Sequence, residues 1–194
     1  FDENTMVELE SGVREIMAKH RDRLTGVVLD LRGNSGGLLK QVVAVSDAFL
    51  ERGEISSTRL LQADEAQHFS ARPGDLVKKF PILVLIDANT AAGAEVFVSA
   101  LRDNRRAFVI GMRSRGSGTV HTWIPLDKKH GILKLATSHL FTPLGVPIEG
   151  RGIEPDIVVK LPKNVVSDLG RTLANIGDYQ LTHALRLISK NQPK

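Results

Sequence analysis

Residues 81–103 read PILVLIDANTAAGAEVFVSALRD, and this stretch decides the fold. A short run of large aliphatic residues, ILVLI (82–86), is typical of a buried strand. Small residues follow it, and apolar residues then recur at helical spacing: Val96, Phe97, Ala100 and Leu101. The stretch therefore predicts a strand, a tight turn and a helix, in that order.

The same unit occurs earlier in the chain. LTGVVLDL (24–31) is a second apolar run, which ends at the glycine-rich RGNSGG (32–37), and a helical pattern then extends over residues 38–51. RAFVIGM (106–112) predicts a third buried strand. Strands that alternate with helices in this way predict an α/β fold with a mostly parallel sheet.

The second half of the chain follows a different pattern. TVHTWIPL (119–126) and ILKLATSHLF (132–141) have alternating faces and predict a C-terminal β-hairpin. GIEPDIVV (152–159) predicts a short edge strand, because Pro155 has no amide hydrogen to donate to a neighbouring strand.

Helices are also predicted near both ends of the chain, close to residues 5–21 and 178–189. The second of these is amphipathic. We therefore expect residues 1–160 to form the core domain. Residues 161–194 are expected to form a C-terminal extension, with one amphipathic helix packed on that core.

The composition excludes several classes of protein. The 194 residues include no cysteine, which removes disulfides and thiol catalysis. A net charge of +4 with one Trp and one Tyr does not indicate a nucleic acid partner. No apolar run is long enough to span a membrane. The six histidines lack metal-site spacing and no phosphate-binding motif occurs, so we expect neither metal nor cofactor.

Two turns are candidates for a functional site. Residues 32–37 and 88–94 each follow a predicted parallel strand, and the carboxyl ends of such strands commonly form the site of an α/β protein. Backbone amides in these turns could form an oxyanion hole or hold a carboxylate. In the alternative interpretation the glycines only permit tight turns. The pattern alone does not choose between the two.

A family resemblance supports the first interpretation. LDLRGNSGGLL (29–39), the ungapped block 82–122 and FTPLGVPIEGRGIEPDI (141–157) together resemble the S41-type C-terminal processing (tail-specific) peptidases. The resemblance spans roughly residues 1–160 and implies a ClpP/crotonase-like α/β core. Members of this family usually carry a PDZ domain before the core, and we expect no PDZ domain in this chain.

The resemblance also assigns the catalytic positions. In the family the turn reads S-A-S-A-[ST]-E with a nucleophilic middle serine, and the lysine and glutamine of G-K-G-x-V-Q act as base and support. The matching segments here are TAAGAE (90–95) and GSGTVH (116–121). They place Ala92 at the nucleophile, Ser117 at the general base and His121 at the glutamine.

The same resemblance implies an oxyanion hole formed by the amide of Gly93 and an amide from the Gly36–Gly37 turn. A methyl group cannot attack a carbonyl, and no lysine is present to activate a hydroxyl. We therefore expect a C-terminal processing peptidase homologue that is catalytically inactive and keeps a polypeptide-binding cleft.

Three alternatives remain open. The chain could be an active serine-type peptidase that uses Ser117 and His121, although residues four apart on a strand are about 13 Å apart. It could be an engineered variant of an active enzyme. It could also be a non-enzymatic subunit that pairs with an active homologue. Thr90, the hydroxyl of the 88–94 turn, is a weaker nucleophile candidate because it suits a helix N-terminus.

The expected partner is a polypeptide with a free C-terminus. Five arginines lie near the predicted site: Arg102, Arg105, Arg106, Arg113 and Arg115. They form either a solvated face or a carboxylate-binding group, and we take Arg113, Arg115 and Thr119 as the candidate substrate-binding residues. A homo-oligomer is a further possibility. The resemblance implies a periplasmic or otherwise exported protein.

Overall fold

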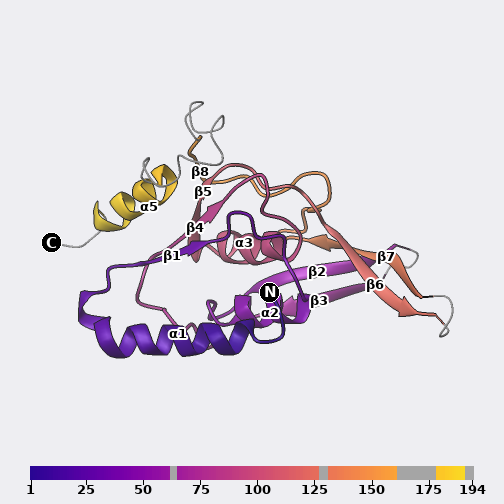
Figure 1. Ribbon diagram of the computed structural model, residues 1–194, viewed down its shortest axis with the longest axis horizontal. Coiled ribbons are helices and arrows are strands. Elements are labelled where there is room, and N and C mark those ends of the chain that lie inside the picture. The colour runs from indigo at the N-terminus through magenta and orange to yellow at the C-terminus, as the bar shows by residue number, and fades with distance from the viewer. Residues whose placement is uncertain (62–64, 127–130, 161–177, 191–194) are drawn as a thin grey trace.

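The computed structural model describes residues 1–61, 65–126, 131–160 and 178–190. It contains two four-stranded sheets with helices packed between and around them (Figure 1). The first sheet is parallel throughout and has the strand order β1-β4-β5-β8. Its strands are β1 (Val27–Asp30), β4 (Ile82–Ile86), β5 (Ala107–Gly111) and β8 (Ile157–Val158). The predicted α/β fold with a parallel sheet is thus confirmed.

The second sheet is antiparallel, with the order β3-β2-β7-β6. Its strands are β2 (Glu54–Leu60), β3 (Ala66–Ser70), β6 (Thr119–Pro125) and β7 (Ile132–Phe141). β6 and β7 are the predicted hairpin, which projects beyond the helices (Figure 1). The sequence analysis did not predict β2 and β3. The central residues of β2, Ser56, Ser57 and Thr58, are buried but polar, so β2 carries no apolar alternation.

Four α-helices have described bounds. They are α1 (Thr5–His20), α2 (Leu39–Asp47), α3 (Gly93–Asp103) and α5 (Tyr179–Lys190), and a short 3-10 helix, η1 (Arg21–Arg23), follows α1. α2 ends four residues before the predicted end of its helix, at 51, because Ala48, Phe49 and Leu50 turn into the core. None of the helices in the described ranges is long and apolar enough to cross a membrane.

β4 shows why the parallel sheet needs a cover on each face. All five of its residues are buried, and successive side chains point to opposite faces. Ile82, Val84 and Ile86 belong to the main core with α3, and Leu83 and Leu85 pack against α5. A strand with this continuous apolar character fits the centre of a parallel sheet. α3 is fully buried from Gly93 to Leu101 and therefore fixes the turn before it.

Candidate functional site

The turn between β4 and α3 has a sharp backbone geometry. Its last residue, Ala92, has φ 51° and ψ −120°, a conformation that non-glycine residues rarely adopt. Gly93 then begins α3. Nucleophile elbows place a serine at this kind of strained strand-to-helix turn. The backbone here has such a shape, and an alanine methyl group occupies the position of the hydroxyl.

The glycine-rich turn after β1 lies directly against Ala92 and Gly93. A Cβ atom built on Gly36 would be 2.5 Å from the Gly93 nitrogen and 3.0 Å from the Ala92 methyl carbon, so only glycine fits there. Among the described residues, neither the Gly37 amide nor the Gly93 amide has a hydrogen-bond acceptor. Gly36 instead donates to the Asn34 side chain at 2.8 Å. Gly36 thus supplies space, and Gly37 and Gly93 supply two unused donors of the kind that stabilise an oxyanion.

Asp87 connects the two turns. Its Oδ1 accepts the amides of Gly33 at 3.0 Å and of Asn89 and Thr90 at 2.9 Å. Partial burial would raise the pKa of the Asp87 carboxyl, but these bonds and one from the Thr90 hydroxyl together lower that pKa below its ordinary value. Thr90 is fully buried, and its hydroxyl donates to the Leu31 carbonyl at 2.9 Å. Thr90 therefore has a structural role.

Glu95 holds the nucleophile position beside the base position. Its buried carboxylate accepts four hydrogen bonds, two on each oxygen: from the Ala92 amide at 2.8 Å, the Ser117 amide at 2.8 Å, the Ser114 hydroxyl at 2.5 Å and the Gly116 amide at 2.7 Å. The amides of Ala92 and Ser117 share Oε2, so the two nitrogens are no more than twice 2.8 Å apart. The register inferred from the sequence thus places Ala92 and Ser117 side by side in space.

The structure does not join Ser117 to His121. Ser117 is half-buried beside Glu95, whereas His121 is exposed on β6, beyond a register shift at Val120. Within the described ranges no hydrogen bond links the Ser117 hydroxyl to the His121 ring. The geometry therefore offers no preformed dyad.

The three candidate substrate-binding residues each have a partner within the chain. Arg113 donates to the Arg151 carbonyl and lies 3.3 Å from Glu154. The Thr119 hydroxyl donates to Glu149 at 2.8 Å. Arg115 donates its side chain to Asn89 at 3.3 Å and its amide to the Thr90 carbonyl at 2.9 Å. Of the three, Arg115 contacts the turn that ends at Ala92.

The arginines do not form one surface. Arg106 makes a largely buried ion pair with Asp75 at 2.5 Å and also donates to the carbonyls of Val77 and Phe80. It precedes β5 and so lies at the amino end of the strand, whereas Arg113 and Arg115 follow the carboxyl end.

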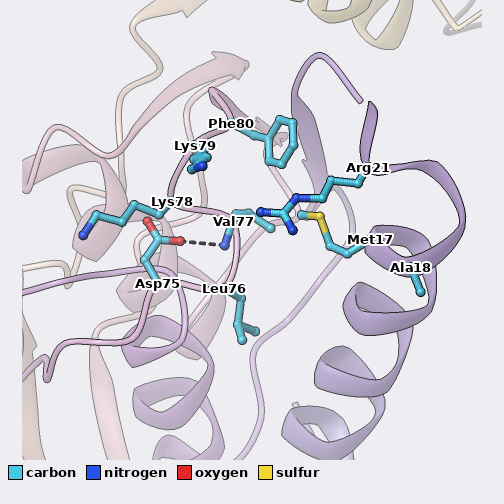
Figure 2. Close-up of a pocket in the computed structure, with 9 residues that line it drawn as sticks. All are labelled: Met17, Ala18, Arg21, Asp75, Leu76, Val77, Lys78, Lys79 and Phe80. Carbon is cyan, nitrogen blue, oxygen red and sulfur yellow. Dashed lines mark hydrogen bonds between the residues drawn. The ribbon is translucent and has the colours of Figure 1, made fainter. Parts of the chain in front are cut away.

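A cavity of about 460 Å³ lies beside the loop that precedes β4 (Figure 2). Its lining combines α1, Arg21 of η1 and the segment Asp75–Phe80. It is at the amino end of β4, opposite the turn that contains Ala92. Its polar groups are chiefly the cations of Arg21, Lys78 and Lys79, which do not form a nucleophile–base pair. The candidate site is therefore the pair of glycine turns. No cluster of metal-ligating side chains occurs in the described part of the chain.

The sequence analysis did not single out Asp87, and it matched Glu95 to the family motif without assigning it a role. A signal for Glu95 was present, because it is the third residue of α3, where a glutamate reaches back to the amide of the residue before the helix. Asp87 directly follows β4, a position from which a side chain reaches the neighbouring turn. Both carboxylates position the site.

The fold and the site together define a class. A parallel sheet carries a nucleophile-elbow turn, a second glycine turn supplies an unused amide, and a buried glutamate holds the segment 116–117 beside the elbow. This is the framework of a serine-type peptidase. The sequence profile of peptidase family S41 matches residues 1–159, and the chain belongs to that family.

Relatives with curated names agree. A carboxy-terminal-processing protease of Bartonella bacilliformis is 47% identical over 163 residues, which cover 84% of this chain and 37% of that protein. A probable CtpA-like serine protease of Staphylococcus haemolyticus is 32% identical over 165 residues, covering 84% of this chain and 32% of that protein. The chain thus spans about a third of the length of these relatives.

Solved structures support the same assignment. The photosystem II D1 C-terminal processing protease superposes on this chain with a TM-score of 0.74 at 28% identity. The superposition covers 82% of this chain and 40% of the protease. A putative S41 protease from Bacteroides fragilis superposes with a TM-score of 0.72 over 96% of this chain and 49% of that one. The second likeness, at 18% identity, concerns the fold alone.

Replacing Ala92 with glycine should stabilise the protein. Glycine removes a backbone strain of about 1–3 kcal/mol, against an entropic loss of about 0.5–1 kcal/mol. The free energy of unfolding should rise by about 1 kcal/mol. A94G is the matched control, since Ala94 lies inside α3 and is not among the residues with positive φ; it should destabilise. Urea unfolding measures both, and an equal loss in the two variants would refute the strain at Ala92.

Replacing Glu95 with glutamine should loosen the site. The NH₂ group of glutamine would replace one carboxylate oxygen and face two donors that this oxygen now accepts. We expect this to lower the free energy of unfolding by about 3 kcal/mol. Hydrogen exchange at Gly116 and Ser117 should accelerate more than exchange within β4. E15Q, whose side chain is 64% exposed on α1, serves as the control and should leave both unchanged. Unaltered exchange at 116–117 in a folded E95Q protein would rule out this role.

Replacing Asp87 with asparagine should reduce the dependence of stability on pH. The pKa of Asp87 is lowered in the fold, below the unfolded value of about 3.9. Its ionised form therefore stabilises the protein above about pH 4, and this contribution is lost as the pH falls through the lower folded-state pKa. The stability of D87N should decline less steeply in acid. Urea unfolding at a series of pH values measures the slopes, which should differ only below about pH 4.

Proposed function

We propose that this chain is the peptidase domain of a C-terminal processing peptidase homologue that binds polypeptide without cutting it. The observation that carries the proposal is Ala92 at the apex of an intact elbow, beside two unused amides at Gly37 and Gly93. The binding framework is present, and the attacking atom is replaced by a methyl group.

The chemistry supports the loss of catalysis. Acyl transfer needs a nucleophile and a base within hydrogen-bond reach of it. Ser117 stands where the family resemblance places the base, and a serine hydroxyl does not accept a proton at neutral pH. With both groups gone, an oxyanion hole and substrate binding alone give only about 10³–10⁴-fold over water, as in the serine-protease template.

β6 offers a way to hold an extended chain. It is the outer strand of the antiparallel sheet and begins two residues after Ser117. No acidic or basic side chain other than His121 occurs in it, and Trp123 and Ile124 are exposed. An extended polypeptide could add to this edge by backbone hydrogen bonds and run toward Ala92. A peptide carbonyl or a terminal carboxylate would then meet the amides of Gly37 and Gly93.

Two other functions stay as hypotheses. A peptidase using Ser117 and His121 would need β6 to rearrange, since His121 lies within β6 and is paired there with Ala136 of β7. A subunit that pairs with an active homologue, or with a second copy, would use the same exposed hairpin. Substrate and partner concern the whole protein, and export to the periplasm or its equivalent also stays a prediction.

Restoring the family residues tests the proposal. The variant A92S/S117K/H121Q should gain cleavage of unfolded β-casein, at least about a hundredfold above A92S/S117M/H121Q, because the base contributes about 10²–10⁴-fold. The methionine control has similar bulk and no amine. Mass spectrometry of the fragments measures the gain, and fluorescence anisotropy with labelled β-casein measures binding by the unaltered protein.

The outcomes are distinct. Binding without cleavage by the unaltered protein, and cleavage after restoration, is the expected pair of results. Cleavage by the unaltered protein that is lost in H121A would replace the proposal with an active enzyme. A folded restored variant that neither binds nor cleaves β-casein would overturn it.

A further inference from the structure

Arg32 is the first residue of the glycine-rich turn and holds two carboxylates at once. Its Nε donates to Asp30 at 2.8 Å and its Nη2 to the other oxygen of Asp30 at 2.5 Å. Nη1 donates to Asp178 at 2.8 Å, and Nη2 reaches the second oxygen of Asp178. Paired, two-point contacts of this kind are among the stronger hydrogen bonds of proteins. The guanidinium is only 21% exposed, which limits screening by water.

The partner residues of Arg32 belong to the start of α5. Asp178 also accepts the Leu181 amide at 3.0 Å and so caps the first turn of this helix. Gln180 is buried, accepts a bond from Arg32 at 3.1 Å and donates to the Val159 carbonyl at 2.8 Å. The hydrogen bond from Arg32 to Asp178 lowers the pKa of the Asp178 carboxyl and keeps this group ionised.

The rest of α5 is held by apolar packing on the outer face of the parallel sheet. Ala184 and Ile188 pack against Leu83, Leu85 and Ile110. A Cβ atom built on Gly26 would be 2.8 Å from the Ile188 side chain, so the helix lies close to the start of β1 as well. α5 is therefore docked along the strand that leads into the glycine-rich turn, and Arg32 joins the helix to the turn itself.

Arg32 is one of several restraints on the turn that presents the Gly37 amide. The Ala91 amide holds the middle of the turn, by donating to the Asn34 carbonyl at 2.9 Å. The Asp87 carboxylate accepts the Gly33 amide near the start of the turn. Phe1 holds the end of the turn: its amino group donates to the Gly36 carbonyl at 2.9 Å, and its carbonyl accepts the Leu38 amide at 2.8 Å. Among the described residues, the hydrogen bonds between the turn and α5 all come from Arg32, which reaches Asp178 across 146 positions of sequence. A turn with several glycines has little conformational preference of its own, so its order depends on such restraints.

We propose that Arg32 is a positioning residue that couples the docking of α5 to the geometry of the Gly37 amide. When α5 is docked, Asp178 and Asp30 fix the guanidinium and the turn behind it. When α5 is displaced, the turn loses this restraint and presents the amide poorly to a polypeptide. The C-terminal helix thereby controls binding at the Gly37 and Gly93 amides through the side chain of Arg32. The proposal rests on the proposed polypeptide binding at Gly37 and Gly93.

The variant D178N tests the coupling, because it removes the charge with little change in shape. Hydrogen exchange at residues 33–38 should accelerate, and labelled β-casein should bind about tenfold more weakly, as is typical of coupled sites. D178E, which keeps the carboxylate, should bind within about twofold of the unaltered protein. D156N is the matched control, since Asp156 also pairs with an arginine, Arg102 at 3.2 Å, away from the turn; it should change neither readout.

The results separate the two proposals. Faster exchange confined to 179–190, with 33–38 unchanged, would show that Arg32 only tethers the helix, and it would overturn the coupling. Failure of the unaltered protein to bind β-casein would count against the proposed function. Exchange at 33–38 would still report on the coupling in that case. An equal loss of binding in D156N would assign the effect to general destabilisation and also refute the coupling.

Discussion

The site depends on one buried carboxylate. Glu95 is completely enclosed and takes its four hydrogen bonds from the elbow, from Ser114 and from the segment 116–117. A buried charge is tolerated only when it is fully hydrogen-bonded, so these donors must stay in place together. Ser114 extends the constraint, because its hydroxyl also accepts the Ile153 amide at 2.7 Å. The nucleophile turn, the base segment and the loop before β8 are therefore one connected unit.

This constraint explains how the elbow keeps its backbone geometry with an alanine at its apex. Ala92 keeps a strained backbone although it has no hydroxyl to present, because its amide is committed to Glu95 and the helix that follows is buried in the core. Strain of this kind persists when the surroundings over-determine it. In this fold the elbow is needed for packing, whether or not it carries a nucleophile. An alanine at position 92 and a serine at position 117 are therefore compatible with an intact surrounding structure.

Much of this arrangement could be predicted from the sequence, and the reasons for the failures are physical. β4 followed from its continuous apolar run, and α3 followed from apolar residues at helical spacing, because both elements are buried. β2 was missed because three of its four buried positions are serine or threonine. The Ser56 hydroxyl, for example, donates to the Phe141 carbonyl at 2.7 Å. The positions of Ala92 and Ser117 came from a family register. The proximity of Ala92 and Ser117 in space could not be predicted, because it depends on hydrogen bonds from both amides to Glu95, which join separate segments of the chain.

The ion pair between Arg32 and Asp178 also has a consequence for the order in which the parts of the domain fold. A chain emerges from the ribosome N-terminal end first. The glycine-rich turn is thus made early, and one of its restraints arrives only 146 residues later. The parallel sheet can form before that, since its strands all precede α5. The turn that presents the Gly37 amide would then be the last part of the domain to mature. With the proposed coupling, a nascent chain would have a folded core before the Gly37 amide was fixed in place, and this last step would wait until synthesis had passed α5.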